Sequence, residues 1–214
     1  MRIGVVADTH CPEYAEHLPA RLAGALAGVE LILHAGDING EATLAELGLI
    51  APVEAVRGDH DAELVNLPPT REFIVEGKKI VVTHGDRSRW LEEPQTLLWT
   101  VTLGYFHPHA GLPRALRRRF PDADVIVYGH THRARVDMLD GVLVFNPGGV
   151  HQWNPTTARR RLAAGRTQGT SQKAPGWFEW CWLQVARHLR SFPRPSIGIL
   201  DFGTGGVVPR VIAL

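Results

Sequence analysis

The chain has 214 residues, with 23 basic and 22 acidic side chains and a hydrophobic content of 44%. This length suits one domain with a full core, and the balanced charge excludes a disordered or polyelectrolyte chain. Its two cysteines are too few for a disulfide scaffold. Eleven histidines raise the question of a metal centre, because histidine is the commonest metal ligand.

Short apolar runs alternate with helical patterns along the chain. Helices are expected at residues 18–27, 40–49 and 112–120. Strands are expected at residues 2–7, 30–35, 52–57, 71–76, 79–83, 124–128, 133–138, 142–145, 196–202 and 207–213. Strand–helix–strand order predicts parallel pairing in the first part, and Asp140-Gly141 predicts a hairpin turn. The expected fold is α/β, with two mixed β-sheets packed as a sandwich and helices on the outside, in a single domain of residues 1–214.

Two segments are too long to be simple connections, residues 86–113 and 150–195. We interpret both as insertions. The first leaves directly after His84-Gly85, and we expect it to form a lid that shapes a substrate pocket. Deleting residues 90–108 should then change substrate preference and leave metal content intact.

The second insertion lies in a part of the chain with a different charge balance. Residues 1–150 carry 14 basic and 20 acidic groups, whereas residues 151–214 carry 9 and 2. Basic residues here surround the run Trp177-Phe178-Glu179-Trp180-Cys181-Trp182. Such a pattern can bind single-stranded nucleic acid by stacking or suit a membrane interface. We favour packing on the domain or a homodimer contact over nucleic acid.

Polar side chains follow six of the predicted strands, most of them beside a glycine. In open α/β sheets, ligands bind at this carboxyl edge. The residue types are Asp and His without a cysteine cluster, a donor set that suits Mn, Fe, Zn, Ni or Co. The residues in question are Asp8, His10, Asp37, Asp59, His60, His84, His130, His132 and Asn146.

The spacing of these residues predicts two neighbouring cations. Side chains two apart in an extended segment point to the same side, so Asp8 and His10 should converge on one ion. His130 and His132 could reach the same ion or an adjacent one. Asp37 stands alone on its own loop and is expected to bridge ions about 3.5–4 Å apart.

Five motifs occur in a characteristic order: Asp8-x-His10, Gly36-Asp37, Gly58-Asp59-His60-Asp61, His84-Gly85 and Gly129-His130-x-His132. Together they resemble the calcineurin-like metallophosphoesterase superfamily, and within it the compact bacterial and archaeal phosphodiesterases, whose fold is shared with the retromer scaffold subunit. The resemblance covers about residues 1–150, including Asn146-Pro147-Gly148, and the hairpin from Arg194. It omits most of the two insertions.

This resemblance implies a binuclear metal centre and a hydrolytic mechanism. One divalent ion would be held by Asp8, His10, Asp37 and His132, and a second by Asp37, Asp59, His84 and His130. A metal-bridging hydroxide would attack phosphorus, with Asp37 as the bridging ligand. His60 would donate a proton to the leaving oxygen or a hydrogen bond to the phosphate.

Two positions depart from the pattern of the compact branch. Asp59 stands where the family usually has Asn, and its extra charge should tighten cation binding and weaken the Lewis acidity of the metals. His60 matches the wider superfamily, where the compact branch often has Cys. Of the neighbouring residues, His34 is expected to support the site from behind, and Asp61 to orient His60 or fix the turn.

The expected function is therefore metal-dependent hydrolysis of a phosphodiester or small phosphate ester. One alternative is a nuclease or RNA phosphodiesterase that uses the basic, Trp-rich insertion. Another is a noncatalytic scaffold of the same fold, which the presence of the metal-binding histidines disfavours. The short apolar start of the chain suits no signal peptide, and no run is long enough for a transmembrane segment, so a cytoplasmic location is expected.

Overall fold

The structure is a computed structural model that describes residues 1–85, 111–152, 154–164, 177–187 and 194–214. The chain divides into two compact units. The first comprises Met1–Asp86, Gly111–His151 and Arg194–Leu214, and the second comprises Arg87–Ala110 and Gln152–Pro193. The expectation of one domain with two insertions stays a prediction.

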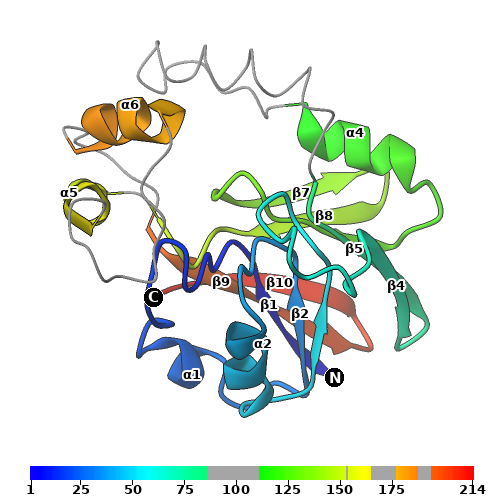
Figure 1. The fold of residues 1–214 in the computed structure, drawn as a ribbon. Coiled ribbons are helices and arrows are strands. Elements are labelled where there is room, and N and C mark those ends of the chain that lie inside the picture. The colour runs from blue at the N-terminus through cyan, green and yellow to red at the C-terminus, as the bar shows by residue number, and fades with distance from the viewer. Residues whose placement is uncertain (86–110, 153, 165–176, 188–193) are drawn as a thin grey trace. The chain divides into compact units, whose positions relative to one another are not determined.

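The first unit contains two five-stranded mixed sheets (Figure 1). The first sheet has the order β10-β9-β1-β2-β3. Strands β1, β2 and β3 run parallel, and β9 pairs antiparallel with both β1 and β10. The bounds are β1 Arg2–Val6, β2 Leu31–His34, β3 Val53–Ala55, β9 Ser196–Gly203 and β10 Gly206–Ala213.

The second sheet has the order β4-β5-β6-β8-β7. Its three central strands, β5, β6 and β8, are parallel, and the edge strands β4 and β7 pair antiparallel. The bounds are β4 Thr70–Val75, β5 Lys78–Thr83, β6 Val125–Val127, β7 Ala134–Leu139 and β8 Val142–Pro147. The predicted pair of mixed sheets is confirmed.

The core lies between the two sheets and follows the alternation of strand side chains. Ile3 and Val5 of β1 face this core, together with Val82 of β5 and Phe145 of β8. Val6 points to the opposite face of the first sheet, into a second apolar cluster. The sandwich thus fixes which strand residues are buried between the sheets, and it leaves the strand ends free for polar residues.

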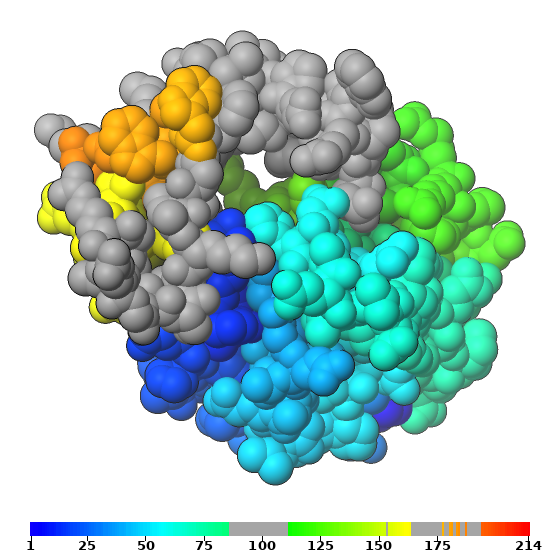
Figure 2. All heavy atoms as spheres, in the orientation of Figure 1, coloured from blue at the N-terminus to red at the C-terminus, as the bar shows by residue number. Residues whose placement is uncertain are grey.

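Among the described residues, three helices cover the outer faces of the sheets. Helices α1 (Leu22–Ala25) and α2 (Glu41–Gly48) contribute Leu22 and Leu47 to the cluster on the first sheet. Helix α4 (Leu112–Arg119) packs Leu112 and Leu116 on the second sheet. In the space-filling view, the light-blue to teal residues from 40 to 80 form a continuous surface on the face shown (Figure 2).

The bounds predicted for one helix and one strand were too long, and the expected insertions overlap parts of the first unit. The helix expected at residues 18–27 shortens to α1, where Arg21 donates no side-chain capping bond. The strand expected at residues 52–57 shortens to β3. The first predicted insertion reaches residue 113, although α4 begins at Leu112. The second begins at residue 150, yet the N–H groups of Val150 and His151 donate to the carbonyls of Ala7 and Asp8 in the first unit.

The second unit contains two described helices, α5 (Pro155–Ala164) and α6 (Trp177–Ala186). Asn154 caps α5, since its Oδ1 accepts the N–H groups of Thr156 and Thr157. Helix α6 contains the Trp-rich run, and it exposes Trp177 and Trp180. No helix in the described ranges has the length and apolar character to cross a membrane. Residues 86–110 of the predicted lid segment lie outside the described residues.

Candidate metal centre

The predicted ligands lie in the loops that follow the carboxyl ends of strands from both sheets. These loops are bonded to one another: the Asp8 N–H donates to the Gly36 carbonyl at 3.0 Å, and the Gly129 N–H donates to the His84 carbonyl at 3.0 Å. The His130 N–H donates to Asp8 Oδ1 at 3.0 Å. The sandwich thus brings residues more than 120 positions apart to one place.

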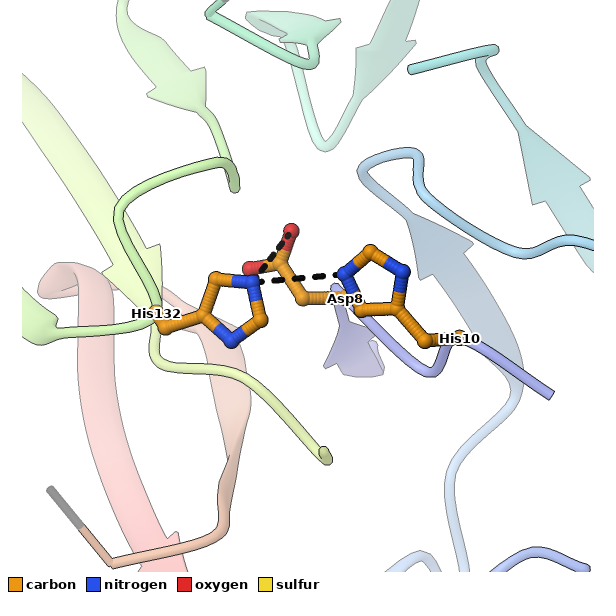
Figure 3. Close-up of side chains that lie close together, drawn as sticks. All are labelled: Asp8, His10 and His132. Carbon is orange, nitrogen blue, oxygen red and sulfur yellow. Dashed lines mark hydrogen bonds and ion pairs between the residues drawn. The ribbon is translucent and has the colours of Figure 1, made fainter. Parts of the chain in front are cut away.

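The structure brings the first predicted ligand set together. His10 Nε2 and His132 Nε2 are 3.3 Å apart, and Asp8 Oδ1 is 3.9 Å from His132 Nε2 (Figure 3). Asp37 Oδ2 lies 3.5 Å from His10 Nε2. One ligand atom from each of Asp8, His10 and His132 falls within 4.8 Å of the others.

The second predicted set lies on the other side of Asp37. Asp37 Oδ1 is 3.4 Å from His84 Nε2, and Asp59 Oδ2 is 3.5 Å from His130 Nδ1. Asp59, His84 and His130 offer ligand atoms within 4.8 Å of one another. The two oxygens of Asp37 therefore face one histidine from each set, which is the place of a shared ligand. The ligand roles themselves stay predictions.

The backbone conformation of these residues differs from the one the spacing argument assumed. Asp8, His10, Asp37, His130 and His132 all have positive φ angles, between 46° and 66°. Asp8 and His10 therefore do not converge as alternate residues of an extended segment, and that reasoning was wrong. Each left-handed residue other than glycine costs about 1–3 kcal/mol, and such residues cluster at functional sites.

Three histidines are oriented by hydrogen bonds through Nδ1. The Nδ1–H of His84 donates to the Ala35 carbonyl at 2.8 Å, and that of His132 donates to the His151 carbonyl at 2.9 Å. His10 Nδ1 donates to Asn39 Oδ1 at 3.1 Å. When such a ring is neutral, its one hydrogen is on Nδ1, and Nε2 presents a lone pair to the centre. This arrangement is typical of metal-ligating histidines.

The buried carboxylates of the site would be stabilised by a bound cation. Burial raises the pKa of Asp8, and Asp8 Oδ2 has no hydrogen-bond partner among the described residues. Burial also lowers the pKa of His10 well below its usual range, so this ring is neutral. Although burial would lower the pKa of His84, the adjacent Asp37 raises it to about 10. A bound cation would take the place of that proton.

The residues present fit a metal ion of nitrogen and oxygen preference. His10 Nε2 and His132 Nε2 lie 3.3 Å apart, while Nδ1 of each ring is hydrogen-bonded on the side away from this contact. Two nitrogens held about 2.0–2.1 Å from one tetrahedral ion lie about 3.3–3.4 Å apart. The donor set contains no cysteine, which argues against a closed structural zinc site.

The centre has a buried floor and an open rim. The side chains of Asp8 and His84 are fully buried, whereas those of Asp59 and His60 are 45% and 39% exposed. The deep ligands are thus shielded, and a solute can approach from the side of Asp59. An accessible side is what a catalytic metal site requires.

Asp61 fixes the loops that carry Asp37 and Asp59. Its buried carboxylate accepts four backbone N–H groups, each at 2.8 Å. The donors are Asp37, Ile38, Asn39 and Gly58. Of the two roles considered for Asp61, the structure supports fixing the turn.

His34 and Asn146 support the site without reaching its ligand atoms. The buried His34 ring accepts the Gly36 N–H at Nδ1 and faces Thr9 Oγ1 through Nε2 at 3.1 Å, and burial lowers its pKa to about 3. Asn146 Nδ2 donates to the Gly129 carbonyl at 2.6 Å. The amide thus ties β8 to the loop that carries His130.

Sequence reasoning missed three residues that border the centre, namely Glu13, Asn39 and His151. Glu13 Oε2 accepts from His60 Nδ1 at 3.0 Å and from Asn39 Nδ2 at 2.6 Å. This hydrogen bond to Glu13 raises the pKa of His60 to about 9. Only Asn39 carried a signal, since Asn39-Gly40 is a common turn dipeptide. Nothing in the sequence pairs positions 13 and 60.

Comparisons with known proteins agree with the fold and identify a family. The sequence profile of the calcineurin-like phosphoesterase superfamily domain matches residues 1–167. A probable metallophosphoesterase of Methanothermobacter thermautotrophicus is 33% identical over 160 residues, covering 74% of this chain and 80% of the relative. A phosphodiesterase of Methanocaldococcus jannaschii is 28% identical over 167 residues, covering 69% of this chain and 83% of the relative.

Solved structures share the fold at low sequence identity. Vps29 from Entamoeba histolytica, as a single mutant, superposes with a TM-score of 0.60 and 18% identity, covering 100% of this chain and 99% of that chain. A structure described as a novel archaeal phosphodiesterase gives a TM-score of 0.54 and 21% identity, with 100% of both chains covered. With the sequence match over most of its length and the two-sheet fold, this chain belongs to the calcineurin-like phosphoesterase superfamily.

Proposed function

We propose that this protein hydrolyses a phosphodiester or small phosphate ester with two divalent transition-metal ions. Asp8, His10, Asp37 and His132 would hold one ion, and Asp37, Asp59, His84 and His130 the other. The observation that carries the proposal is the placement of Asp37, whose two oxygens face His10 and His84 at 3.5 and 3.4 Å. One carboxylate between two histidine-containing sets is the arrangement of a shared ligand.

The side chains divide the work between binding and chemistry. When bound, the ions would supply Lewis-acid stabilisation of the phosphoryl oxygens and lower the pKa of an attacking water. Asp8 and His84 form the buried floor, and the ester would approach on the side of the exposed Asp59. His60 lies at this open rim and would donate a proton to the leaving oxygen.

Metal content and hydrolysis, measured together, test the proposal. The purified protein would be loaded with Mn, Ni, Co or Zn and assayed on a panel of phosphate monoesters and diesters. We expect about two ions per chain by elemental analysis. Asp37→Ala should lose bound metal and at least about 100-fold in kcat/KM, because both ions depend on this side chain.

Matched variants separate the site from general damage. His130→Ala should reduce binding of one ion, whereas the exposed His17→Ala should change neither metal content nor rate. Full activity in both Asp37→Ala and His130→Ala would overturn the two-metal assignment. Two bound ions without hydrolysis of any ester in the panel would overturn the assignment as an esterase.

A further inference from the structure

His60 is held against the metal centre by its backbone and its ring. Its N–H donates to Asp37 Oδ1 at 3.0 Å. Its ring lies edge-on to the His10 ring, with centroids 4.9 Å apart and planes at 88°. To donate a proton to the leaving oxygen, the His60 ring must be held in one orientation relative to the metal centre.

Glu13 supplies that direction from a different loop. Its Oε2 lies 3.0 Å from His60 Nδ1, although the two residues are 47 positions apart. A carboxylate only accepts hydrogen bonds, so Nδ1 carries the hydrogen and donates it. Nε2, on the other edge of the ring, is then the nitrogen left to serve the leaving group.

Asn39 fixes Glu13 in turn and connects it to a metal ligand. Its Nδ2 donates to Glu13 Oε2 at 2.6 Å and to the His60 carbonyl at 3.1 Å, while its Oδ1 accepts from His10 Nδ1 at 3.1 Å. The Tyr14 ring packs edge-on to the His60 ring, with centroids 5.8 Å apart. Hydrogen bonds and ring contacts thus restrain His60 from several sides.

We propose that Glu13 is a positioning residue that orients His60 toward the leaving oxygen of the ester, an inference that rests on the proposed function. As the bond from phosphorus to the leaving oxygen breaks, its electron pair stays on that oxygen, which takes the proton from His60 Nε2. The oxygen of the attacking water forms the new bond to phosphorus, and that water releases one proton to the solvent. His60 ends neutral, with its Nδ1–H still donated to Glu13.

Leaving-group dependence tests this role, because an acid matters only when the leaving oxygen needs a proton. In Glu13→Ala at saturating metal, kcat on esters with alkyl leaving groups should fall about 10–100-fold. Nitrophenyl esters, whose leaving group is stable as an anion, should lose less than about 3-fold. KM should stay constant in both cases. Glu13→Gln keeps an acceptor oxygen and should recover most of the loss, and Glu16→Ala on the same loop is the exposed control.

A double-mutant cycle shows whether Glu13 acts through His60. Adding Glu13→Ala to His60→Ala should cause no further loss. A further loss there, or an equal loss on alkyl and nitrophenyl esters, would overturn the proposal, since Glu13 would then support the loop or the metals.

Two measurements without substrate separate this inference from the proposed function. The ring Nδ1–H signal of His60, assigned by its absence in His60→Ala, should be protected from exchange in wild type and Glu13→Gln and lost in Glu13→Ala. An unchanged signal in Glu13→Ala refutes the positioning, whether or not any ester is hydrolysed. Metal content should be equal in wild type and Glu13→Ala. If the proposed function fails, the wild type itself binds no metal or hydrolyses no ester, whereas the ring signal still reports whether Glu13 holds His60.

Discussion

The loops that carry Asp37 and Asp59 depend on one buried carboxylate. Asp61 is 1% exposed and accepts four backbone N–H groups at 2.8 Å. Two donors, Asp37 and Gly58, share Oδ2, and the other two share Oδ1. Replacing this side chain therefore affects two loops at once, and the effect can be worked out donor by donor.

Asp61→Asn is the sharpest perturbation because it changes few atoms. The amide keeps one acceptor oxygen and turns the other into an N–H₂ group that faces two donors. A hydrogen bond to a charged group contributes about 1.5–3 kcal/mol, and unsatisfied buried donors add a cost of similar size. Because the four bonds share one carboxylate and are not additive, we expect a loss of about 3–5 kcal/mol in the free energy of unfolding. Asp61→Ala should lose at least as much.

Urea unfolding of the metal-free proteins measures this loss, and calorimetric titration measures metal affinity. We expect metal affinity to fall about 10–100-fold in Asp61→Asn, since the loops position two ligands. Asp124→Asn is the matched control: Asp124 accepts the Lys79 N–H at 2.9 Å, but its side chain is 39% exposed. That control should lose less than about 1 kcal/mol. A loss below 1 kcal/mol in Asp61→Asn, with unchanged metal affinity, would refute the reasoning.

Three further changes have predictable outcomes. A Cβ on Gly58 would lie 2.3 Å from Asp37 Oδ1, so Gly58→Ala should displace that carboxylate and weaken metal binding. Gly24→Ala in α1 is the control, because a Cβ there meets nothing within 4 Å. Equal metal content of the two variants by elemental analysis would contradict this prediction. Asp59→Asn should weaken metal affinity in titrations and raise kcat modestly, because a neutral ligand leaves the metals more acidic, and tighter binding would argue against a ligand role. His34 is neutral in the fold with a pKa of about 3, against 6.5 when unfolded, so its contribution to stability is constant above pH 6.5 and is lost as the pH falls toward 3. At pH 5 the loss of unfolding free energy due to His34 amounts to about 2 kcal/mol. Urea unfolding of the metal-free protein should therefore depend less on pH in His34→Asn than in wild type. Parallel pH curves for the two proteins would exclude this role of His34.

Much of the fold could be predicted from the order of apolar runs. Strand–helix–strand alternation correctly gave parallel pairing of β1 with β2 and of β2 with β3, and Asp140-Gly141 marked the β7–β8 hairpin. Element ends were less predictable: the helix expected at residues 18–27 shortens to α1 because cooperative helix formation depends on packing as well as propensity. The sequence does not decide whether the Trp-rich run is a strand or a helix, since aromatics fit either periodicity in a short segment.

The sequence by itself determined which chemistry the centre can support. Asp and His at the ends of successive strands specify oxygen and nitrogen donors, and their order specifies the superfamily. This works because strand ends in parallel sheets gather at one edge whatever the loop details.

Only the tertiary structure decided how these donors are aimed. The left-handed backbone at Asp8 and His10, the carbonyl that orients His84, and the Glu13–His60 hydrogen bond depend on loops that meet across two sheets. Such contacts join residues far apart in the chain, and local periodicity carries no information about them. The physical reason is that side-chain direction is set by φ, χ and the partner's position, which are fixed only when the sandwich closes.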